Sequence, residues 1–390
     1  GASDGAPPVN AEYTILLTAI FAASACALVG TFLILRGMAM MADAISHAIL
    51  PGLVVAYFVA NGPNFIAGVL GAGAAGVLTV ALVEALQRTG KVKSDAAIGI
   101  VFPALFAFGT FLVSRYFSTV HLDADAVLFG EIAFAPFDRL IISGVDYGSQ
   151  PMIVLGGLAL MNLLLVLLFF KELKIATFDA GLAATLGFSP VLVHYGLMTT
   201  VSVTTVGSFS AVGAILVVAL MIVPAATAYL LTDRLDLMIA LSVGSGIASA
   251  ISGYYIARAV DVSISGMMAV MAGALFTAAA LGSPSHGIIA RAVRRHRLRD
   301  TFAVQILVLH LGHHATAAES NASLAAELDW SAEHLQHIAA KGIAAGLVQQ
   351  VGDHIALTPS GNIFASEHPY GPRSRGLSGD SGTLRTANAQ

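Results

Sequence analysis

Asp43 and His47 are the two residues whose types and spacing suggest chemistry within an otherwise apolar stretch. They stand four positions apart in Asp43-Ala-Ile-Ser-His47, so a helix brings both side chains to one face about one turn apart. A single ion can then contact both of them. Ionisable groups inside a membrane span are costly unless they pair or line a polar path, although a hydrogen-bonded structural pair near the membrane boundary has the same spacing.

One carboxylate and one imidazole make half of a coordination sphere for a metal ion. Two such helices facing each other across a dimer axis would supply two oxygens and two nitrogens. Mixed oxygen and nitrogen ligation suits Mn(II), Fe(II) or Zn(II) and argues against Cu(I), which prefers sulfur ligands. Pro51 follows the pair and predicts a kink that aims both side chains at a central pathway. The single cysteine, Cys26, excludes a cysteine-rich metal cluster.

The elements expected to position this pair are membrane-spanning helices. Of the 390 residues, 57% are hydrophobic and 11% are charged, against about 25% charged residues in a soluble domain, which excludes a soluble enzyme. We divide the apolar stretch 191–231 at Gly207-Ser208, and a re-entrant piece there would leave eight crossings. Nine stretches approach the roughly 20 residues that cross a bilayer: about 11–35, 38–60, 64–86, 96–116, 151–170, 191–207, 209–231, 237–257 and 263–281.

Basic residues predict the orientation of the membrane part. With nine alternating crossings, most of the Lys and Arg residues between the spans fall on one side, which the positive-inside rule makes cytoplasmic. We therefore expect the amino terminus outside and the carboxyl terminus in the cytoplasm. The cytoplasmic group is Arg36, Arg88, Lys91, Lys93, Lys171, Lys174 and Arg234, and the external group is Arg115, Arg139 and Arg258.

Composition divides the chain into five parts. The expected fold class is an all-α polytopic membrane protein with eight or nine transmembrane helices, plus a small cytoplasmic α+β winged-helix-like domain. The arginine-rich linker is expected to anchor the chain at anionic lipid. The parts are an external segment at 1–10, a transmembrane domain at 11–285, a basic linker at 286–299, the cytoplasmic domain at 300–366 and a disordered tail at 367–390.

The cytoplasmic domain has the sequence pattern of three helices and a hairpin. Serines precede two of the helices as caps, and glycines mark the stop of the third helix and the hairpin turn. The expected elements are an apolar-rich helix at Thr301–His314, a short helix from Ser320 or Ser323 through Asp329, a helix from Ser331 to Ala345 before Gly346, and a hairpin of 347–351 and 354–357 around Gly352-Asp353.

Four segments carry a family pattern in order along the chain: Leu35–Gly52, Ser94–Phe102, Leu128–Gly130 and Val212–Leu231. Together they resemble the membrane permeases of manganese, zinc and iron ABC importers, and the resemblance covers roughly residues 11–285. Within the first segment, Arg36-Gly37-Met38 and Ile49-Leu50-Pro51-Gly52 are more similar to the manganese and iron branch than to the zinc branch. Ala42 departs from the glycine that usually precedes the acidic residue.

The resemblance implies roles for particular residues. Asp43 and His47 match the transmembrane metal-binding positions of the family. Residues 178–189 are similar to its coupling helix, which docks on the ATPase subunit, and Asp179, Ala183 and Gly187 are the candidate coupling residues. Asp179 can cap a short helix and Gly187 can end it, although a plain interfacial connector has the same pattern.

The chain contains no G-x-x-x-x-G-K-[ST] phosphate loop. We therefore expect a transport subunit and not an enzyme, with no permanently bound cofactor and with ATP hydrolysed by a separate subunit.

The C-terminal part resembles the winged-helix domains of metal-responsive repressors, including the segment Leu357–Gly361. Its expected recognition helix, Ser331–Ala345, offers Lys341 as its single fixed positive charge. Because DNA binding by counterion release needs several basic contacts, we do not expect this domain to bind DNA. Ordinary surface histidines are the alternative to a regulatory site for cytosolic metal, whose candidate ligands are His310, His313, His314, His334 and His337.

Other polar residues are weaker candidates. Glu84, His194 and His286 are expected at helix boundaries. A solvated acidic loop is expected between the fourth and fifth spans, where it could also meet an arriving metal or its carrier protein; its polar residues are His121, Asp123, Asp125 and Glu131.

The sequence thus predicts the permease subunit of a bacterial ABC importer for Mn(II) or Fe(II) in the cytoplasmic (inner) membrane. Its expected partners are the lipid bilayer, an ABC ATP-binding subunit, an extracytoplasmic metal-binding protein and a second permease chain, either identical or a shorter paralogue. The alternatives are a zinc ABC permease, an ion-gradient-driven metal carrier and a membrane-anchored transcription regulator.

Overall fold

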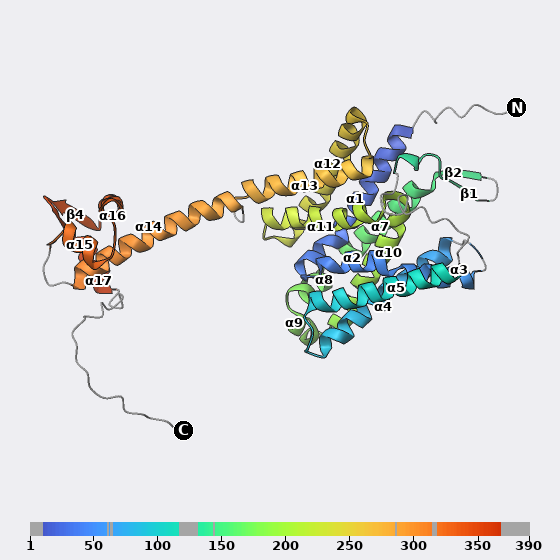
Figure 1. Cartoon of the computed structure of the whole chain (residues 1–390), viewed down its shortest axis with the longest axis horizontal. Helices are drawn as coiled ribbons and strands as arrows, with labels where there is room; N and C mark the ends of the chain where they lie inside the picture. Colours follow the sequence, from blue (N-terminus) through green and yellow to red (C-terminus); the bar gives the residue numbers. More distant parts are fainter. Residues whose placement is uncertain are drawn as a thin grey trace, which may run out of the picture. The chain divides into compact units, whose positions relative to one another are not determined.

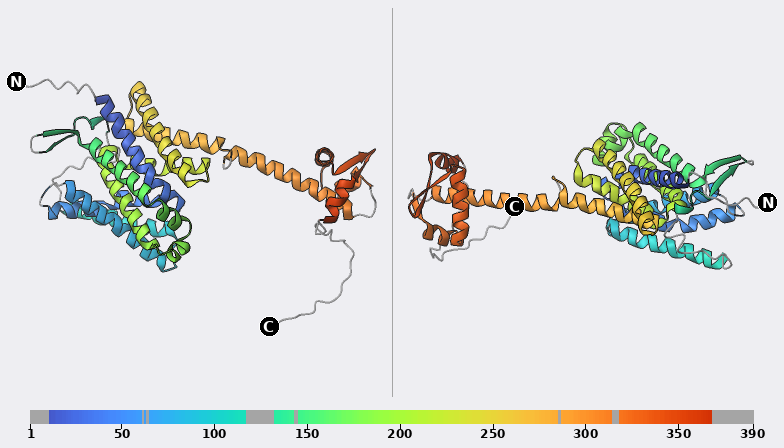
Figure 2. Two further views of the ribbon diagram at one scale, coloured as in Figure 1. Left: turned by 180° about the vertical axis from the view of Figure 1, so that it is seen from behind. Right: turned by 90° about the horizontal axis from the view of Figure 1, so that it is seen from above.

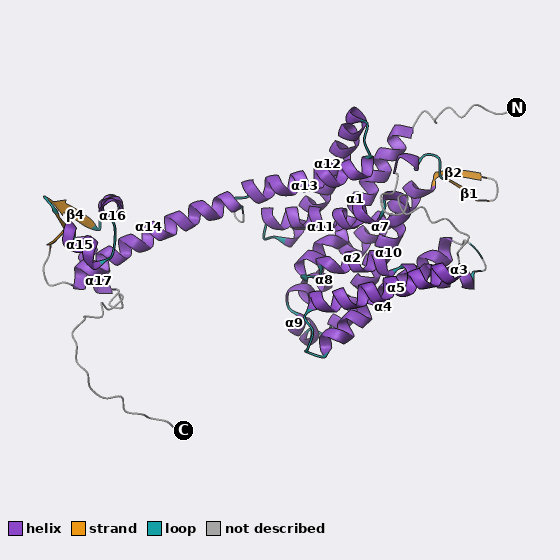
Figure 3. Cartoon of the chain, viewed as in Figure 1, coloured by secondary structure: helices purple, strands orange, loops and turns teal. Residues whose placement is uncertain are grey.

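The computed structural model describes residues 11–60, 62, 65–116, 132–142, 145–284, 287–313 and 318–367. The chain forms two compact units, residues 1–290 and residues 291–390. Helices make up most of the described residues, and the strands are few and short (Figures 1 and 3).

The first unit is a bundle of long apolar helices (Figure 1). Helix α1 packs against α7, α11 and α12, so it lies within the bundle and is surrounded by helices from the second half of the unit (Figure 2). The elements are α1 (Ala11–Leu35), α2 (Ala39–Ala48), α3 (Leu50–Val59), α4 (Phe65–Arg88), α5 (Ser94–Tyr116), the 3-10 helix η1 (Ile132–Phe134), β1 (Arg139–Ile142), β2 (Val145–Ser149), α7 (Gln150–Leu168), α8 (Phe170–Phe178), α9 (Ala180–Thr185), α10 (Pro190–Val212), α11 (Ala214–Leu231), α12 (Leu235–Val260) and α13 (Ile264–Gly282).

Eight helical segments among the described residues are long and apolar enough to cross a membrane. In this count α2 and α3 form one segment, and α10 is not included. Helix α10 nevertheless has 23 residues, and the burial of its hydroxyl side chains at Thr204, Thr205 and Ser208 places it in the bundle interior. The expected all-α polytopic fold with eight or nine transmembrane helices is confirmed.

The division of the long apolar stretch at Gly207-Ser208 is wrong, because α10 continues to Val212 and Gly213 separates it from α11. Gly213 has a φ of +78°, a left-handed conformation that glycine adopts readily. Gly207 remains helical and serves close packing, since a Cβ there would lie 2.5 Å from Cδ1 of Leu158 on α7. Two glycines in one stretch thus have different roles, which composition alone does not separate.

The helix is interrupted between α2 and α3, at the place where a kink was expected after His47. Ile49 separates the two helices, and Pro51 occupies the first turn of α3. A proline ring has no N–H to donate and clashes with the carbonyl one turn earlier in a continuous helix. The segment that carries the Asp43–His47 pair therefore ends within one turn of His47.

Glycines let several helices of the bundle approach at backbone distance. A Cβ on Gly30 of α1 would lie 1.9 Å from the carbonyl oxygen of Met221 on α11. A Cβ on Gly52 of α3 would lie 2.1 Å from the carbonyl oxygen of Gly71 on α4. Small residues favour such close helix pairs in lipid, where van der Waals packing holds helices together, as the glycine-rich spans predicted.

We expect Gly30→Ala to destabilise the bundle by about 1–3 kcal/mol, the usual cost of overpacking. The clash is with the backbone of α11, which cannot move aside as a flexible side chain can. Gly244→Ala in α12 is the matched control, because a Cβ at Gly244 meets no described atom within 4 Å. Thermal unfolding of both variants in detergent measures the difference, and equal transition temperatures would contradict the packing argument.

Polar contacts mark the two ends of α1. At its start, Glu12 forms an ion pair with Arg258 at the end of α12, with an N–O distance of 2.7 Å. Just past its other end, Arg36 donates to Oγ1 of Thr177 on α8 and lies against Nδ1 of His194 on α10, both at 3.3 Å. The end of α1, the end of α8 and the start of α10 therefore lie together, opposite the end of α12.

The hairpin of β1 and β2 was not predicted from the sequence. Its strands are antiparallel, and Nε of Arg139 donates to Asp146 at 2.8 Å. The pKa of Asp146 is held below its usual value because Arg139 and the backbone N–H of Gly148 donate to its charged form. Ser149 then accepts from the backbone N–H of Met152 and caps α7, so the hairpin leads directly into a long helix.

The second unit combines helices with a three-stranded antiparallel sheet in the order β3-β5-β4. A compact apolar core contains Leu307, Leu311, Leu324, Leu335 and Ile338. The remaining elements of the chain are α14 (Ile288–His313), β3 (Ala318–Ser320), α15 (Asn321–Glu327), α16 (Ala332–Ala344), β4 (Val348–Val351), β5 (His354–Leu357) and α17 (Pro359–Glu367).

Local signals in the sequence located the helix starts and the hairpin of the second unit. Ser320 accepts from the N–H of Ser323 at the start of α15, and Ser331 accepts from the N–H of His334 at the start of α16. The β4–β5 hairpin turns at Gly352, whose φ is +64°. The short helix, the third helix and the hairpin are confirmed, whereas the winged-helix assignment stays a prediction.

Other features of the second unit differ from the expectation. Helix α14 begins at Ile288, so most of the segment expected as a basic linker is helical, in keeping with the good helix propensity of arginine. Strand β3 and helix α17 were not predicted. Strand β3 has three residues, too few to show a period of two, and it depends on pairing with β5, which is distant in the sequence.

Candidate metal-binding site

Asp43 and His47 both lie on α2, with Nε2 of His47 3.6 Å from Oδ1 of Asp43. Their side chains are 47% and 31% exposed in the single chain. Their neighbours Ala44 and Ile45 are buried, at 1% and 0% exposure. Helix α2 therefore packs one face into the bundle and leaves the acid and the imidazole together on its open face.

Two aromatic residues of α5 pack against the imidazole. The His47 ring centroid lies 5.3 Å from that of Phe102 and 6.1 Å from that of Phe106, which meets it edge-on. Phe106 is itself 44% exposed, so it extends the open face on which the pair lies. The aromatic contacts restrict the rotation of His47 and hold its ring beside Asp43.

The pair can offer one carboxylate oxygen and one imidazole nitrogen to an ion. Among the described residues, no third His, Cys, Asp or Glu joins them in a cluster of ligand atoms. A tetrahedral site needs four ligands, so this pair alone would fill half of one. Because ionisable groups facing lipid are costly, this open face favours contact with a second protein surface.

A polar network lies at the end of the bundle that contains Arg36. It includes Glu84 and His194, which were expected as boundary residues. Arg36 lies against His194, as described above, and burial lowers the pKa of the Arg36 guanidinium below its ordinary value. Glu84 pairs with Arg88 at 2.9 Å and accepts from the hydroxyl of Tyr195. The network joins segments that are far apart in sequence, so spacing could not reveal it.

Helix α9 is an exposed short helix between α8 and α10, as predicted for residues 178–189. Asp179 caps it by accepting from the N–H of Leu182 at 2.9 Å, and Gly187 follows it with a φ of +88°. Ala183 is fully buried against its own chain. Asp179 and Gly187 therefore shape the ends of the helix and remain exposed, Ala183 seats it, and the apolar part of its exposed surface is made by other residues.

Leu182 and Leu186 make that surface, with exposures of 49% and 55%, and Phe178 beside them is 62% exposed. The two leucines are four positions apart and share one face of the turn. Sequence reasoning missed them as contact residues, although their apolar type and their four-residue spacing were available as a signal.

Among the described residues, the four candidate regulatory histidines His310, His313, His334 and His337 do not form one site. His310 lies beside two glutamates of the second unit, and His334 packs against Trp330 with ring centroids 5.1 Å apart. His337 is 58% exposed and lies 3.9 Å from a carboxylate oxygen of Asp300. His313 is exposed near the end of α14, and His314 lies outside the described residues.

Several weaker candidates also lie outside the described residues. They are His121, Asp123, Asp125, Glu131 and His286.

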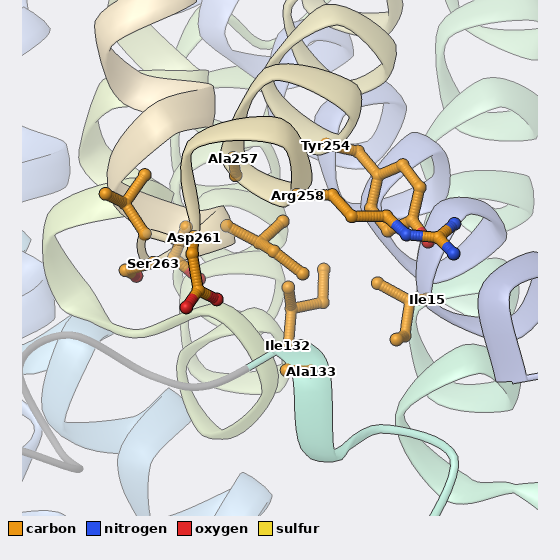
Figure 4. A pocket seen from close by; sticks show the side chains of 11 residues that line it. Ile15, Ile132, Ala133, Tyr254, Ala257, Arg258, Asp261 and Ser263 are labelled. Atoms are coloured by element: carbon orange, nitrogen blue, oxygen red, sulfur yellow. The ribbon is translucent and has the colours of Figure 1, made fainter. Parts of the chain in front are cut away.

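A cavity of about 500 Å³ lies near the start of α1, at the end of the bundle opposite Arg36. Figure 4 shows the side chains around it, among them Ile15, Ile132, Tyr254, Arg258 and Asp261. It contains none of the candidate site residues, so it adds no ligand to the Asp43–His47 pair.

The fold and the site define a polytopic membrane transport subunit: long apolar helices enclose a buried core, and one broken helix carries an ionisable pair. The chain belongs to the ABC 3 transport family, whose pattern matches residues 11–283. This confirms the family resemblance found in the sequence and the expectation of a transport subunit that is not an enzyme.

Known relatives support this membership. The chain is 45% identical over 357 residues to the zinc transport system membrane protein TroD of Treponema pallidum, covering 90% of this chain and 97% of that protein. It is 47% identical over 283 residues to the manganese transport system membrane protein MntD of Bacillus subtilis, covering 73% and 96%. The solved structure of PsaBC from Streptococcus pneumoniae in complex with Fab is similar, with a TM-score of 0.60 and 32% identity over 73% of this chain and 95% of that one.

Proposed function

We propose that the chain is the membrane permease of an ATP-driven importer that carries Mn(II) or Fe(II), with Zn(II) as the alternative cargo. Family membership and relatives named for manganese, zinc and iron transport support the importer class. The observation that carries the cargo class is the Asp43–His47 pair, which joins an oxygen and a nitrogen donor on an open face of a membrane helix.

Two permease chains form the pathway, either as a homodimer or with a shorter paralogue. One chain supplies only half of a coordination sphere, and its Asp43–His47 face is left uncovered. A second α2 helix across a dimer axis supplies the other carboxylate and imidazole. The ion then loses part of its water shell to two oxygens and two nitrogens, which hold it between the two sides of the membrane.

A separate ATP-binding subunit drives the change of access. The open apolar surface of α9, made by Leu182 and Leu186, is suited to a groove on that subunit. Helix α9 packs against α10, and α10 in turn packs against α2. A displacement of α9 is thereby passed through rigid helices to the element that carries Asp43 and His47. An extracytoplasmic metal-binding protein delivers the ion from the other side.

The chain crosses the bacterial cytoplasmic (inner) membrane nine times, with its start outside and its end in the cytoplasm. The opposite positions of Arg36 and Arg258 along the bundle support this orientation, because basic residues concentrate on the Arg36 side. In this arrangement α10 and α11 are two crossings joined at Gly213. The winged-helix-like second unit then lies in the cytoplasm.

Competition in proteoliposomes that contain the complete transporter tests the cargo. We expect ATP-dependent accumulation of Mn(II) that excess Fe(II) suppresses by being carried itself, and no ATP-dependent accumulation of Zn(II), because the segments flanking Asp43 and His47 are more similar to the manganese and iron branch of the family. Omission of the ATP-binding subunit is the control and should abolish uptake. Uptake that persists on an ion gradient without that subunit would favour a gradient-driven carrier. ATP-dependent accumulation of Zn(II) itself would favour a zinc permease, whereas suppression by Zn(II) alone would not, since Zn(II) generally binds nitrogen and oxygen ligands more tightly than Mn(II) does.

A further inference from the structure

His310, Glu319 and Glu327 bring their ligand atoms together in the second unit. Nε2 of His310 lies 3.0 Å from Oε2 of Glu327 and 3.7 Å from Oε2 of Glu319. All three ligand atoms lie within 4.8 Å of one another. We propose that these residues form a second metal site, distinct from the transport pair, which binds a divalent transition-metal ion.

Three different elements supply the cluster, and the core of the second unit holds them in place. His310 is followed on α14 by Leu311, which is 3% exposed, and Glu327 lies one turn after Leu324 on α15, which is 0% exposed. Glu319 lies on β3 opposite Ile355 of β5. Ligands carried by packed elements keep their geometry without an ion, so binding requires little rearrangement.

The charges of the cluster favour a dication. The side chains of Glu319 and His310 are only 10% and 13% exposed, and a carboxylate at such a position is costly unless its charge is compensated. A divalent ion bound by His310 and both carboxylates compensates both negative charges.

The distances suit an ion of the first transition series. Ligands about 2.1 Å from a tetrahedrally bound ion lie roughly 3.4 Å apart, between the two distances from His310 to the glutamates. Two oxygens and one nitrogen without thiolate suit Mn(II), Fe(II) or Zn(II) and argue against Cu(I). Glu327 is 44% exposed, which leaves a path for the ion and positions for water.

The link between this site and transport rests on the proposed function, because the site would bind the same class of ion that the permease imports. Of the five histidines predicted as regulatory ligands, the second metal site contains only His310. Its other two ligands are glutamates that the sequence analysis did not consider. The TroD alignment of 357 residues is longer than the first unit of 290 residues, so that relative also contains at least part of the second unit.

Metal binding by the full-length chain tests the proposal. The chain carries Asp43→Asn and His47→Gln, so that the transport pair no longer competes, and Mn(II) is added alone while its free concentration is followed by electron paramagnetic resonance. We expect one saturable site per chain. Glu319→Gln, Glu327→Gln and His310→Gln should each weaken binding by at least about tenfold, since changes outside the direct ligands already cost about that much.

His334→Gln is the matched control, because His334 is an exposed histidine of the same unit that packs on Trp330 and should leave binding unchanged. Glu327 is partly exposed, so Glu327→Gln keeps the fold and decides the outcome if a more buried variant does not fold. Circular dichroism of each variant without metal checks folding. Absence of saturable binding, or affinity within twofold of the parent in Glu327→Gln, would overturn the site and leave an ion-pair cluster.

The measurement is independent of the proposed transport function. It needs neither the ATP-binding subunit nor uptake, and the background variants lack the transport pair. A site confirmed in a chain that fails to import metal would contradict the importer proposal while leaving the site intact. A functional importer whose background variant shows no saturable binding would refute the second metal site and leave the importer proposal intact.

Discussion

We expect metal uptake to fall to background when Asp43→Asn or His47→Gln replaces either member of the proposed transport pair. Both changes keep the approximate size of the side chain but remove a proposed ligand from a pair that no third His, Cys, Asp or Glu of the described residues joins. We expect a loss of at least about 100-fold, because even residues that only orient metal ligands contribute 10- to 100-fold. Radioactive Mn(II) uptake by proteoliposomes containing the complete transporter measures it.

Asp236→Asn is the matched control for this experiment. Asp236 is a carboxylate near the start of α12 that pairs with Arg234 at 2.9 Å on an exposed surface, where an ion pair contributes little to stability. We expect it to retain normal uptake. Size-exclusion chromatography should show that all three variants assemble alike. Full uptake by both pair variants would remove Asp43 and His47 from the mechanism.

Leu182→Asp together with Leu186→Asp is expected to uncouple ATP from transport, with the ATP-binding subunit lost on purification. The two side chains are about half exposed on α9, so charged residues do not disturb the core of this chain. They would be desolvated in an apolar groove of a partner, and a buried unpaired charge costs several kcal/mol. A loss of several kcal/mol weakens association by more than about 100-fold.

Leu182→Met together with Leu186→Met is the conservative control, because methionine keeps the apolar surface and approximate volume. It should retain both the ATP-binding subunit and uptake. Co-purification separates an effect on docking from an effect on the pathway, since the Asp43 and His47 variants should keep the subunit. Normal uptake by the double aspartate variant would exclude this face of α9 as the docking surface.

Local features of the chain were predicted well because short-range rules govern them. The four-residue spacing of Asp43 and His47 puts them on one helical face whatever surrounds the helix. Ser331 caps α16, and Asp179 caps α9, because a cap bonds to the backbone two or three residues away. Pro51 ends a helix by its own geometry. Each of these needs no knowledge of distant residues.

Features that depend on distant residues could not be predicted in this way. The helix break falls at Gly213 and not at Gly207, because Gly207 packs against Leu158 on another helix. Glu319 and Glu327 lie beside His310 because β3 pairs with β5 and α15 packs in the same core. Neither arrangement leaves a period or a spacing that marks it along the chain.

The sequence by itself determined that this protein is a multi-span membrane protein with an acid and an imidazole one helical turn apart, because hydrophobic length and helical periodicity are properties of contiguous residues. Only the tertiary structure decided which of its polar and apolar groups remain open to a partner. It leaves Asp43, His47, Leu182 and Leu186 partly exposed, buries Ala183, and gathers a separate cluster around His310. Exposure and convergence depend on how helices pack against one another, which is set by contacts across the whole bundle.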